Sequence, residues 1–375
     1  MKITSYIHPV RTFLPCTGAG RHINNVLLEL ASHKKIDLEL IFSGQWLEDG
    51  IALPRRSPLS QLPYRTFPMR ENFAERSWKL TGFPRMDKYV PESTDWLFAP
   101  METYFPIAKC PVAITIFDVQ AFEPDLPWSQ SLTHQWFRYK WGRWVRKAID
   151  HSQVVFTISE FSKQRMVDLL HADSSKIVNV GCGVEKDFFE ISSILPDSIE
   201  SFTESPYVFM IGGLREKKGG DHFLSVSKQL QQRKSNIKIV IAGNSEPKYV
   251  AAAASHSNII LLGIVPDEDL PRLLRRSVCL LFLSLYEGFG IPPLEAMAAG
   301  VPAVVANRAS LPEVVGDAGI VVEPDNPAEI VDIITSLEKD SLLRESYIHK
   351  GQKHAATYTW SSCAEKVVST LEKFS

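Results

Sequence analysis

Two glutamates, Glu287 and Glu295, stand eight positions apart in the stretch from Ser284 to Asn307. An apolar run, Val278 to Phe282, predicts a buried strand directly before this stretch. Side chains that follow the carboxyl end of a parallel strand lie where α/β folds bind ligands. Acidic residues are also common at any helix start. The glycines and prolines around this pair nevertheless favour a binding site over an ordinary acidic helix start.

The residues around the second glutamate predict a short helix with a well-fixed start. Pro292 and Pro293 suit the first helical positions, where a backbone N–H would have no helical partner, and Gly300 suits the left-handed residue that ends the helix. The free N–H groups near Gly290 and Ile291 would point outward with the positive end of the helix dipole. Such a helix start attracts an anion, for example a diphosphate.

The same stretch reads E-G-F-G-I-P-P-L-E-A-M-A-A-G-V-P, and it resembles the retaining glycosyltransferases of family 4. Those enzymes carry an E-x7-E motif and have the GT-B fold, an α/β fold of two facing doubly wound domains with a cleft between them. The resemblance implies that Glu287 faces the donor sugar and that Glu295 binds the ribose hydroxyls. It adds Phe289 and Leu294 to the expected donor-binding residues. A second segment that begins at Ser310, S-L-P-E-V-V-G-D-A-G, also matches the family.

A basic loop, G-G-L-R-E-K-K-G-G, follows the first strand predicted in the second half of the chain. Its Arg215, Lys217 and Lys218 stand between glycines, which suits a phosphate cradle, although a solvated basic loop is the alternative. In family 4 this loop commonly reads G-R…K-G, and its Arg and Lys hold the diphosphate. Lys218 matches that Lys, whereas Gly213 occupies the Arg position, so we expect Arg215 to take the place of that Arg.

The next two loops are expected to hold the nucleobase. The resemblance implies recognition through the backbone near Gly243 and around Ile264 and Val265. A small pyrimidine needs only one amide and one carbonyl, so the sequence favours UDP, and UDP-glucose as the commonest donor among relatives; GDP-mannose is the alternative. Asp267 and Asp269 form a D-x-D pair, but Pro266, Asp267 and Glu268 open a predicted helix, so capping and the helix dipole explain the acidic residues without a metal. We expect no cofactor beyond the nucleotide-sugar co-substrate.

Length and composition predict two domains of average size. The chain has 375 residues, 45% of them hydrophobic and 22% charged, with a net charge of −2, which excludes the basic excess of a nucleic-acid binder. Residues 1–150 carry 19 Lys and Arg against 15 Asp and Glu. This basic half is the one expected to meet an anionic surface.

The cysteines and the apolar runs point to the cytoplasm. The five cysteines show no metal or disulfide spacing, so we expect reduced thiols. The opening M-K-I-T-S-Y-I-H-P-V predicts a strand rather than a secretory leader, and no apolar run approaches the roughly 20 residues that span a bilayer. Any contact with a membrane would therefore be peripheral.

Apolar runs in the N-terminal half predict parallel strands covered on both faces. After the first of them, Gly18 and Gly20 precede a predicted helix. These glycines suit a tight turn or a phosphate contact, and the resemblance places such a loop beside the donor phosphates and the acceptor. The predicted strands of this half are Ile3–Ile7, Ile36–Phe42, Trp96–Ala99, Val112–Ile116 and Val154–Ile158.

Three segments of this half are less regular. Residues 44–91 mix Arg and Lys, including Arg55 and Arg56, with aromatic residues, so we expect helices that shape the acceptor side. Phe117 stands where family 4 usually has His, which implies a lost sugar contact. The helix predicted over residues 135–150 carries Phe137, Trp141, Trp144 and Ala148 on one face and basic residues largely off it. It fits a core-facing stripe better than a helix that lies on an anionic membrane, but both interpretations stay open.

Strands alternate with helical patterns in the second half, which predicts a second doubly wound domain. The expected organisation is residues 1–190 on the acceptor side, a linker over 191–206, a nucleotide-sugar domain over 207–355, and a helix over 356–375 that returns to the first domain. Predicted strands of the second domain are Tyr207–Ile211, Ile237–Ala242, Ile259–Leu262, Val278–Phe282, Pro302–Ala306 and Ile320–Val322.

We therefore expect a retaining, metal-independent glycosyltransferase. Its catalytic residues would be Glu287, Lys218 and Arg215, and its acceptor a saccharide or a polyprenyl diphosphate-linked saccharide at the inner face of the membrane. No strong base stands out, which suits a mechanism in which the departing phosphate takes the acceptor proton. An epimerase or hydrolase of the same fold, and a nucleotide-binding regulator without turnover, are the rival hypotheses.

Overall fold

The computed structural model describes residues 1–8, 12, 17–48, 58–190 and 205–375. These residues form two compact units, each built around one sheet. Unit 1 comprises Met1–Gly183 and Trp360–Ser375, and unit 2 comprises Val184–Thr359. The expected boundaries at 190 and 356 differ from these by a few residues, and residues 191–204 of the expected linker lie outside the described residues.

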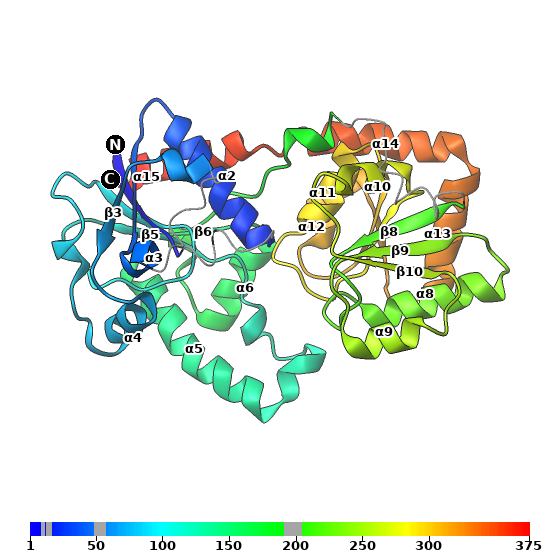
Figure 1. The fold of residues 1–375 in the computed structure, drawn as a ribbon, viewed down its shortest axis with the longest axis horizontal. Coiled ribbons are helices and arrows are strands. Elements are labelled where there is room, and N and C mark those ends of the chain that lie inside the picture. Colours follow the sequence, from blue (N-terminus) through cyan, green and yellow to red (C-terminus); the bar gives the residue numbers. More distant parts are fainter. Residues whose placement is uncertain (9–11, 13–16, 49–57, 191–204) are drawn as a thin grey trace. The chain divides into compact units, whose positions relative to one another are not determined.

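Unit 1 contains a parallel sheet with the strand order β3-β2-β1-β4-β5-β6-β7. The central strands are buried along nearly their whole length, because helices cover the sheet on both faces (Figure 1). The strands are β1 (Lys2–Tyr6), β2 (Asp37–Ser43), β3 (Tyr64–Phe67), β4 (Trp96–Ala99), β5 (Val112–Thr115), β6 (Val154–Thr157) and β7 (Ile177–Asn179).

The helices of unit 1 connect these strands in sequence order. Residues 44–91 contain helices, as expected, and also the strand β3. Arg55 and Arg56 lie outside the described residues. The α-helices are α2 (Gly18–Ser32), α3 (Gln45–Glu48), α4 (Glu71–Thr81), α5 (Leu132–His151), α6 (Glu160–Leu170) and α15 (Trp360–Phe374). Short 3₁₀ turns are η1 (Pro58–Gln61), η2 (Met86–Lys88), η3 (Gln120–Phe122), η4 (Pro127–Gln130) and η5 (Ser174–Lys176).

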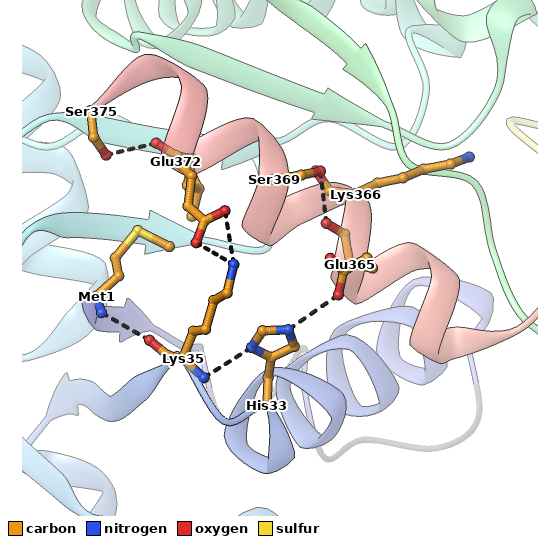
Figure 2. A network of polar contacts seen from close by, with 9 residues as sticks. Met1, His33, Lys35, Glu365, Lys366, Ser369, Glu372 and Ser375 are labelled. Carbon is orange, nitrogen blue, oxygen red and sulfur yellow. Dashed lines mark hydrogen bonds and ion pairs between the residues drawn. The ribbon is translucent and has the colours of Figure 1, made fainter.

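Helix α15 packs against α2 although the whole of unit 2 separates them in the chain. Its buried side chains include Trp360, Val367 and Leu371. At the rim of this contact, Lys35 Nζ lies 3.0 Å from Glu372 Oε1 and His33 Nε2 lies 3.1 Å from Glu365 Oε2 (Figure 2). Exposed ion pairs of this kind contribute little to stability, so the apolar contact accounts for most of the attachment.

Helix α5 departs from the expected pattern. Its buried residues are Gly142, Val145, Ala148 and Ile149, all in the C-terminal part of the helix. Phe137, which we expected on the core face, is 47% exposed. The amphipathic pattern predicted the helix correctly. The first half of the helix, however, extends beyond the core, so the apolar face predicted there is exposed.

Unit 2 contains a six-stranded parallel sheet with the order β10-β9-β8-β11-β12-β13. One cluster of its core consists mainly of Val, Ile and Leu side chains from the strands and from α8, α9 and α13. The strands are β8 (Tyr207–Ile211), β9 (Lys238–Ala242), β10 (Ile259–Gly263), β11 (Leu280–Phe282), β12 (Ala303–Ala306) and β13 (Ile320–Val322). The helices are α8 (Gly220–Gln232), α9 (Pro247–Ala253), α10 (Leu270–Arg276), α11 (Ile291–Ala298), α12 (Leu311–Val315), α13 (Pro327–Lys339) and α14 (Ser341–Ala355), with turns η6 (Lys186–Phe188) and η7 (Gly316–Ala318).

The strand order of unit 2 fixes where its ligand site should lie. The chain runs from β8 outward through β9 and β10, then returns to the other side of β8 and continues through β11, β12 and β13. The point between β8 and β11 is therefore a topological switch point, where the loops after the two strands diverge and leave a crevice. The basic loop follows β8, and the loop that holds the first glutamate follows β11.

Candidate functional site in unit 2

The loops after β8 and β11 are joined by backbone and side-chain contacts. The N–H of Leu285 donates to the carbonyl oxygen of Lys217 across 2.9 Å. Next to this bond, Lys218 Nζ lies 2.5 Å from Glu287 Oε1. The structure therefore brings together Lys218 and Glu287, two of the three residues that the sequence predicted to be catalytic.

The Lys218–Glu287 ion pair is largely shielded from solvent. The Lys218 side chain is 21% exposed and that of Glu287 15%. Burial raises the pKa of Glu287, but the charges of Lys218 and Lys217 and hydrogen bonds from Lys218 and Ser284 outweigh it, so the pKa lies below the usual carboxyl range. Glu287 is thus an anion at neutral pH. It can stabilise a developing positive charge, but it does not hold a proton to give to a leaving group.

Ser310 fixes the loop that carries Glu287. Its hydroxyl is completely buried and lies 2.9 Å from the carbonyl oxygen of Glu287 and 2.7 Å from that of Phe289. The hydroxyl has one proton, which the two acceptors share. Sequence reasoning did not select Ser310, although it begins the second segment that resembles family 4.

Gly290 turns the chain from this loop into α11. Its φ of +107° lies in the left-handed region, and a Cβ at this position would lie 2.7 Å from Leu311 Cδ2. Pro292 and Pro293 follow in the first turn and have no N–H, so Gly290 and Ile291 supply the amides that are free of helical bonding there. These are the amides that could face an anion.

The first turn of α11 contains no acidic residue, which excludes the ordinary acidic helix start as an explanation of the two glutamates. Glu295 lies in the middle of the helix and is only 1% exposed. Its role with the ribose stays a prediction. Gly300 follows the helix with a φ of +73°, as expected for the left-handed residue that ends it.

Two glycines allow the loops after β8 and β9 to touch. Gly213 has a φ of +72°, and a Cβ on it would lie 2.1 Å from the carbonyl oxygen of Asn244. A Cβ on Gly243 would in turn lie 2.8 Å from the N of Gly213. No larger residue fits at position 213, so the Arg that family 4 has there would need a different loop.

Arg215 is exposed, and its Nε donates to the carbonyl oxygen of Asn244 across 2.9 Å. In the described part of the chain its side chain makes no contact with Glu287 or Lys218 that meets hydrogen-bond or ion-pair distance. The structure thus places Arg215 on the same loop as the ion pair but not within it. Its part in holding a diphosphate stays a prediction.

The expected nucleobase loops lie beside each other. The N–H of Gly243 donates to the carbonyl oxygen of Gly263 across 2.6 Å, which links the ends of β9 and β10. Gly263 has a φ of +69°. The next residue, Ile264, is 77% exposed, and Val265 is half-buried. An exposed apolar side chain in this place could cover the face of a flat ring, and the base assignment stays a prediction.

The D-x-D pair differs from its expected role in one respect. Asp269 immediately precedes α10, but its side chain does not cap the helix; Asp269 Oδ1 instead lies 3.2 Å from Arg272 Nη1. The carboxylate of Asp269 is thus engaged in an ion pair, and Pro266, Asp267 and Glu268, which were expected to open the helix, precede it. Among the residues that the structure describes, no group of three or more His, Cys, Asp or Glu could hold a metal ion.

The glycines of unit 1 also differ from expectation. Gly18 and Gly20 lie inside the first turn of α2 rather than before it, and Thr17 caps this helix by accepting the N–H of Gly20 through its hydroxyl at 3.1 Å. That amide is thus already bonded. Gly18 and Gly20 thus form part of a helix instead of a tight turn, and the Gly20 amide is not free to bind a phosphate.

His22 was not selected from the sequence. It is buried, and the centre of its ring lies 5.3 Å from that of Phe117 and 5.6 Å from that of Trp360. Its Nε2 lies 3.2 Å from the carbonyl oxygen of Gly181. Burial lowers its pKa to about 4, although the Gly181 contact raises it. A neutral His22 thus packs against the residue that stands where relatives have histidine.

Comparison with known proteins supports a glycosyltransferase. Residues 193–354 match the family described as glycosyl transferases group 1. The chain is 27% identical over 403 residues to the O-antigen chain mannosyltransferase B of Escherichia coli, a match that covers 99% of this chain and 100% of that protein. It is also 27% identical over 240 residues to the Escherichia coli serotype-specific mannosyltransferase WbdA, covering 58% of this chain and 28% of that longer protein.

Solved structures give the fold. Anabaena HepE in complex with UDP and glucose superposes with a TM-score of 0.70 at 16% identity, covering 100% of both chains. WaaG, a glycosyltransferase involved in lipopolysaccharide biosynthesis, superposes with a TM-score of 0.68 at 15% identity, covering 98% of this chain and 99% of that one. At this identity the likeness concerns the fold alone. That fold is GT-B, with two parallel-sheet Rossmann-like units.

Replacement of Gly213 by Ala should disrupt the site far more than replacement of Gly263. Both glycines have positive φ, so each substitution costs about 1–2 kcal/mol in backbone strain. Only Gly213 also meets a backbone oxygen, at 2.1 Å, whereas nothing lies within 4 Å of a Cβ on Gly263. Thermal unfolding and nucleotide titration of the two variants check this. Equal losses in both variants would contradict the steric role of Gly213.

Glu287→Gln should lower turnover roughly a hundredfold or more, because it removes the negative charge that we expect to face the reacting sugar. Binding of nucleoside diphosphate should be equal or tighter, since the substitution frees Lys218 and removes repulsion of an anionic ligand. Steady-state kinetics and calorimetry measure the two effects, with Glu338→Gln on the exposed side of α13 as the matched control. A variant with normal turnover, or one that no longer binds nucleotide, would refute this assignment.

Proposed function

We propose that this protein transfers a hexose, with retention at the anomeric carbon and without a metal, from a nucleoside diphosphate sugar to a saccharide hydroxyl in polysaccharide assembly. The observation that carries the proposal is the Lys218–Glu287 ion pair at the switch point of unit 2, at 2.5 Å. It places a cation and an anion side by side. A glycosyl transfer needs both, because the leaving diphosphate gains negative charge while the anomeric carbon becomes positive.

Each residue of this site then has a chemical part. Lys218 and the amides at the start of α11 stabilise the departing diphosphate. Glu287, ionised because its pKa is lowered, stabilises the positive sugar. The bond from the anomeric carbon to the phosphate oxygen breaks, the bond to the acceptor oxygen forms on the same face, and the acceptor proton passes to the departing phosphate. Arg215, exposed on the same loop, would meet the outer charge of the diphosphate.

For the donor we propose mannose carried on GDP, the alternative named from the sequence. The relative that aligns with almost the whole chain is named a mannosyltransferase. UDP-glucose was favoured because it is common among relatives and because a small base suits recognition through the backbone. Neither reason distinguishes this chain from a mannosyltransferase, whereas the name of the full-length relative supports GDP-mannose.

For the acceptor we propose a growing saccharide on a polyprenyl diphosphate at the cytoplasmic face of the membrane. That relative is named for the O-antigen chain, and the basic residues 1–150 belong to unit 1. An epimerase or hydrolase would release or convert the sugar without acceptor. A regulator would bind nucleotide and give no product in any acceptor mixture.

Calorimetry with GDP and UDP side by side tests the donor. We expect GDP to bind at least roughly tenfold more tightly, a difference of about 1.4 kcal/mol. Release of GDP from GDP-mannose that depends on a mannose-containing acceptor should accompany it. Tight UDP binding with undetectable GDP binding would return the assignment to a uridine donor, and free mannose formed without acceptor would favour a hydrolase.

Turnover should survive exhaustive dialysis against EDTA, because Lys218 and the start of α11 balance the diphosphate charge. Asp269→Asn should also keep turnover and lose about 1–3 kcal/mol of stability, since Asp269 is buried and its carboxylate pairs with Arg272 among the described residues. Activity that disappears with EDTA and returns with manganese would overturn metal independence and reopen the D-x-D pair as a metal site.

A further inference from the structure

The first half of α5 exposes large apolar side chains that the described residues of unit 1 do not cover. Leu132 is 82% exposed, Trp136 63% and Tyr139 69%. Their spacing of four and three residues places them on one stripe of the helix, opposite the buried Val145 and Ile149. Helix α5 lies at the margin of unit 1 in Figure 1.

The same stripe is strongly basic. Arg143 and Arg146 continue it toward the C-terminal end of α5, both exposed, and neither forms an ion pair with any residue that the structure describes. Residues 126–150 contain five Lys and Arg against one acidic residue, Asp150, near the C-terminal end of α5. One of the five, Arg138, points inward and donates to the carbonyl oxygens of Glu123 and Ser129, so it belongs to the fold rather than to the stripe.

A hollow of about 530 Å³ adjoins the C-terminal end of this stripe. Its lining includes Arg143, Arg146 and Lys147, together with Tyr104 and Asp150. Lys147 Nζ lies 4.0 Å from the centre of the Tyr104 ring, which holds the ammonium group in place. Lys147 also donates to the carbonyl oxygen of Lys79, so the hollow offers the two exposed arginines beside an aromatic wall, with Asp150 as the one carboxylate in its lining, and the excess of positive charge suits an anionic headgroup.

We propose that the exposed stripe of α5, formed by Leu132, Trp136, Tyr139, Arg143 and Arg146, docks the protein on an anionic lipid bilayer. The interface of a bilayer suits both the apolar and the basic part of this stripe. Trp and Tyr side chains lie at the level of the headgroups, and Arg side chains reach the lipid phosphates. A helix that lies in this interface is bound by apolar burial and by attraction to anionic lipid together. No helix among the described residues has the length and apolarity to cross a membrane, so this contact is made from one side.

This inference is independent of the proposed reaction, because the stripe shares no residue with the site in unit 2. An acidic protein partner would need negative charges opposite the arginines but offers no general match for a row of exposed Leu, Trp and Tyr. A second copy of this chain would bring like charges together. Charge and apolar exposure thus favour the bilayer over both.

Sedimentation of the full chain with vesicles tests the docking. Binding should be clear on equal parts of phosphatidylglycerol and phosphatidylcholine, weak on phosphatidylcholine alone, and reduced as salt rises. Trp136→Ala/Tyr139→Ala and Arg143→Glu/Arg146→Glu should each lower binding to the anionic vesicles roughly tenfold or more. Circular dichroism and thermal unfolding establish that both variants fold, and transfer to a soluble acceptor should be unchanged.

Leu342→Ala and Lys350→Glu/Lys353→Glu on α14 are the matched controls, since these residues are also exposed. They should bind vesicles like the unaltered chain. The proposal is overturned if the α5 variants do so as well, or if the unaltered chain binds both kinds of vesicle equally. It is also overturned if light scattering shows that the α5 variants change the oligomeric state and leave vesicle binding intact.

Discussion

The close approach of backbone loops at the carboxyl edge of the second sheet is the constraint on which the site depends. Gly213 and Gly243 let the loops after β8 and β9 touch, and a Cβ on Gly219 would lie 2.2 Å from the carbonyl oxygen of Leu283 after β11. Three loops therefore meet without side chains between them. Lys218, beside Gly219, is thereby held within reach of Glu287. Any larger residue at these glycines would separate Lys218 from Glu287, the two groups that the proposed transfer requires together.

The pairing of Lys218 with Glu287 also answers an energetic requirement. Each charge alone would be costly where the side chains are about four-fifths shielded, and each compensates the other. The pair keeps Glu287 ionised and keeps Lys218 in one place. A diphosphate that enters the crevice would compete with Glu287 for the lysine, so the site exchanges one anionic partner for another instead of ordering a free side chain. The conformational-entropy cost of binding is therefore lower, because Lys218 is already held in place.

The sequence predicted the parts of the fold that apolar runs encode. Buried central strands such as β4 and β8 were found with their observed bounds, because both of their faces are covered. The edge strand β3 was missed, since only Phe67 of its four residues is buried and no apolar run marks it. Glu287 and Lys218 could be selected from motif and loop position.

What the sequence did not reveal depends on contacts between distant segments. Ser310 acts through carbonyl groups more than twenty positions earlier in the chain, and the burial of His22 depends on Gly181 and Trp360. The exposure of the first half of α5 likewise depends on where the core ends. The periodic pattern of the helix does not show that position. In each of these cases the missing information was which residues lie nearby in the fold, and not the type of the residue itself.

The return of α15 to unit 1 has a consequence for biosynthesis. Domains generally fold in the order in which the ribosome makes them. Here Trp360–Ser375 complete unit 1 but are translated after all of Val184–Thr359. Until they emerge, the face of α2 that contacts α15 stays uncovered, with apolar side chains exposed to other nascent chains. Unit 2, which is continuous in sequence, can finish folding first. Unit 1 is therefore completed last, and it is the unit that a chaperone would need to shield.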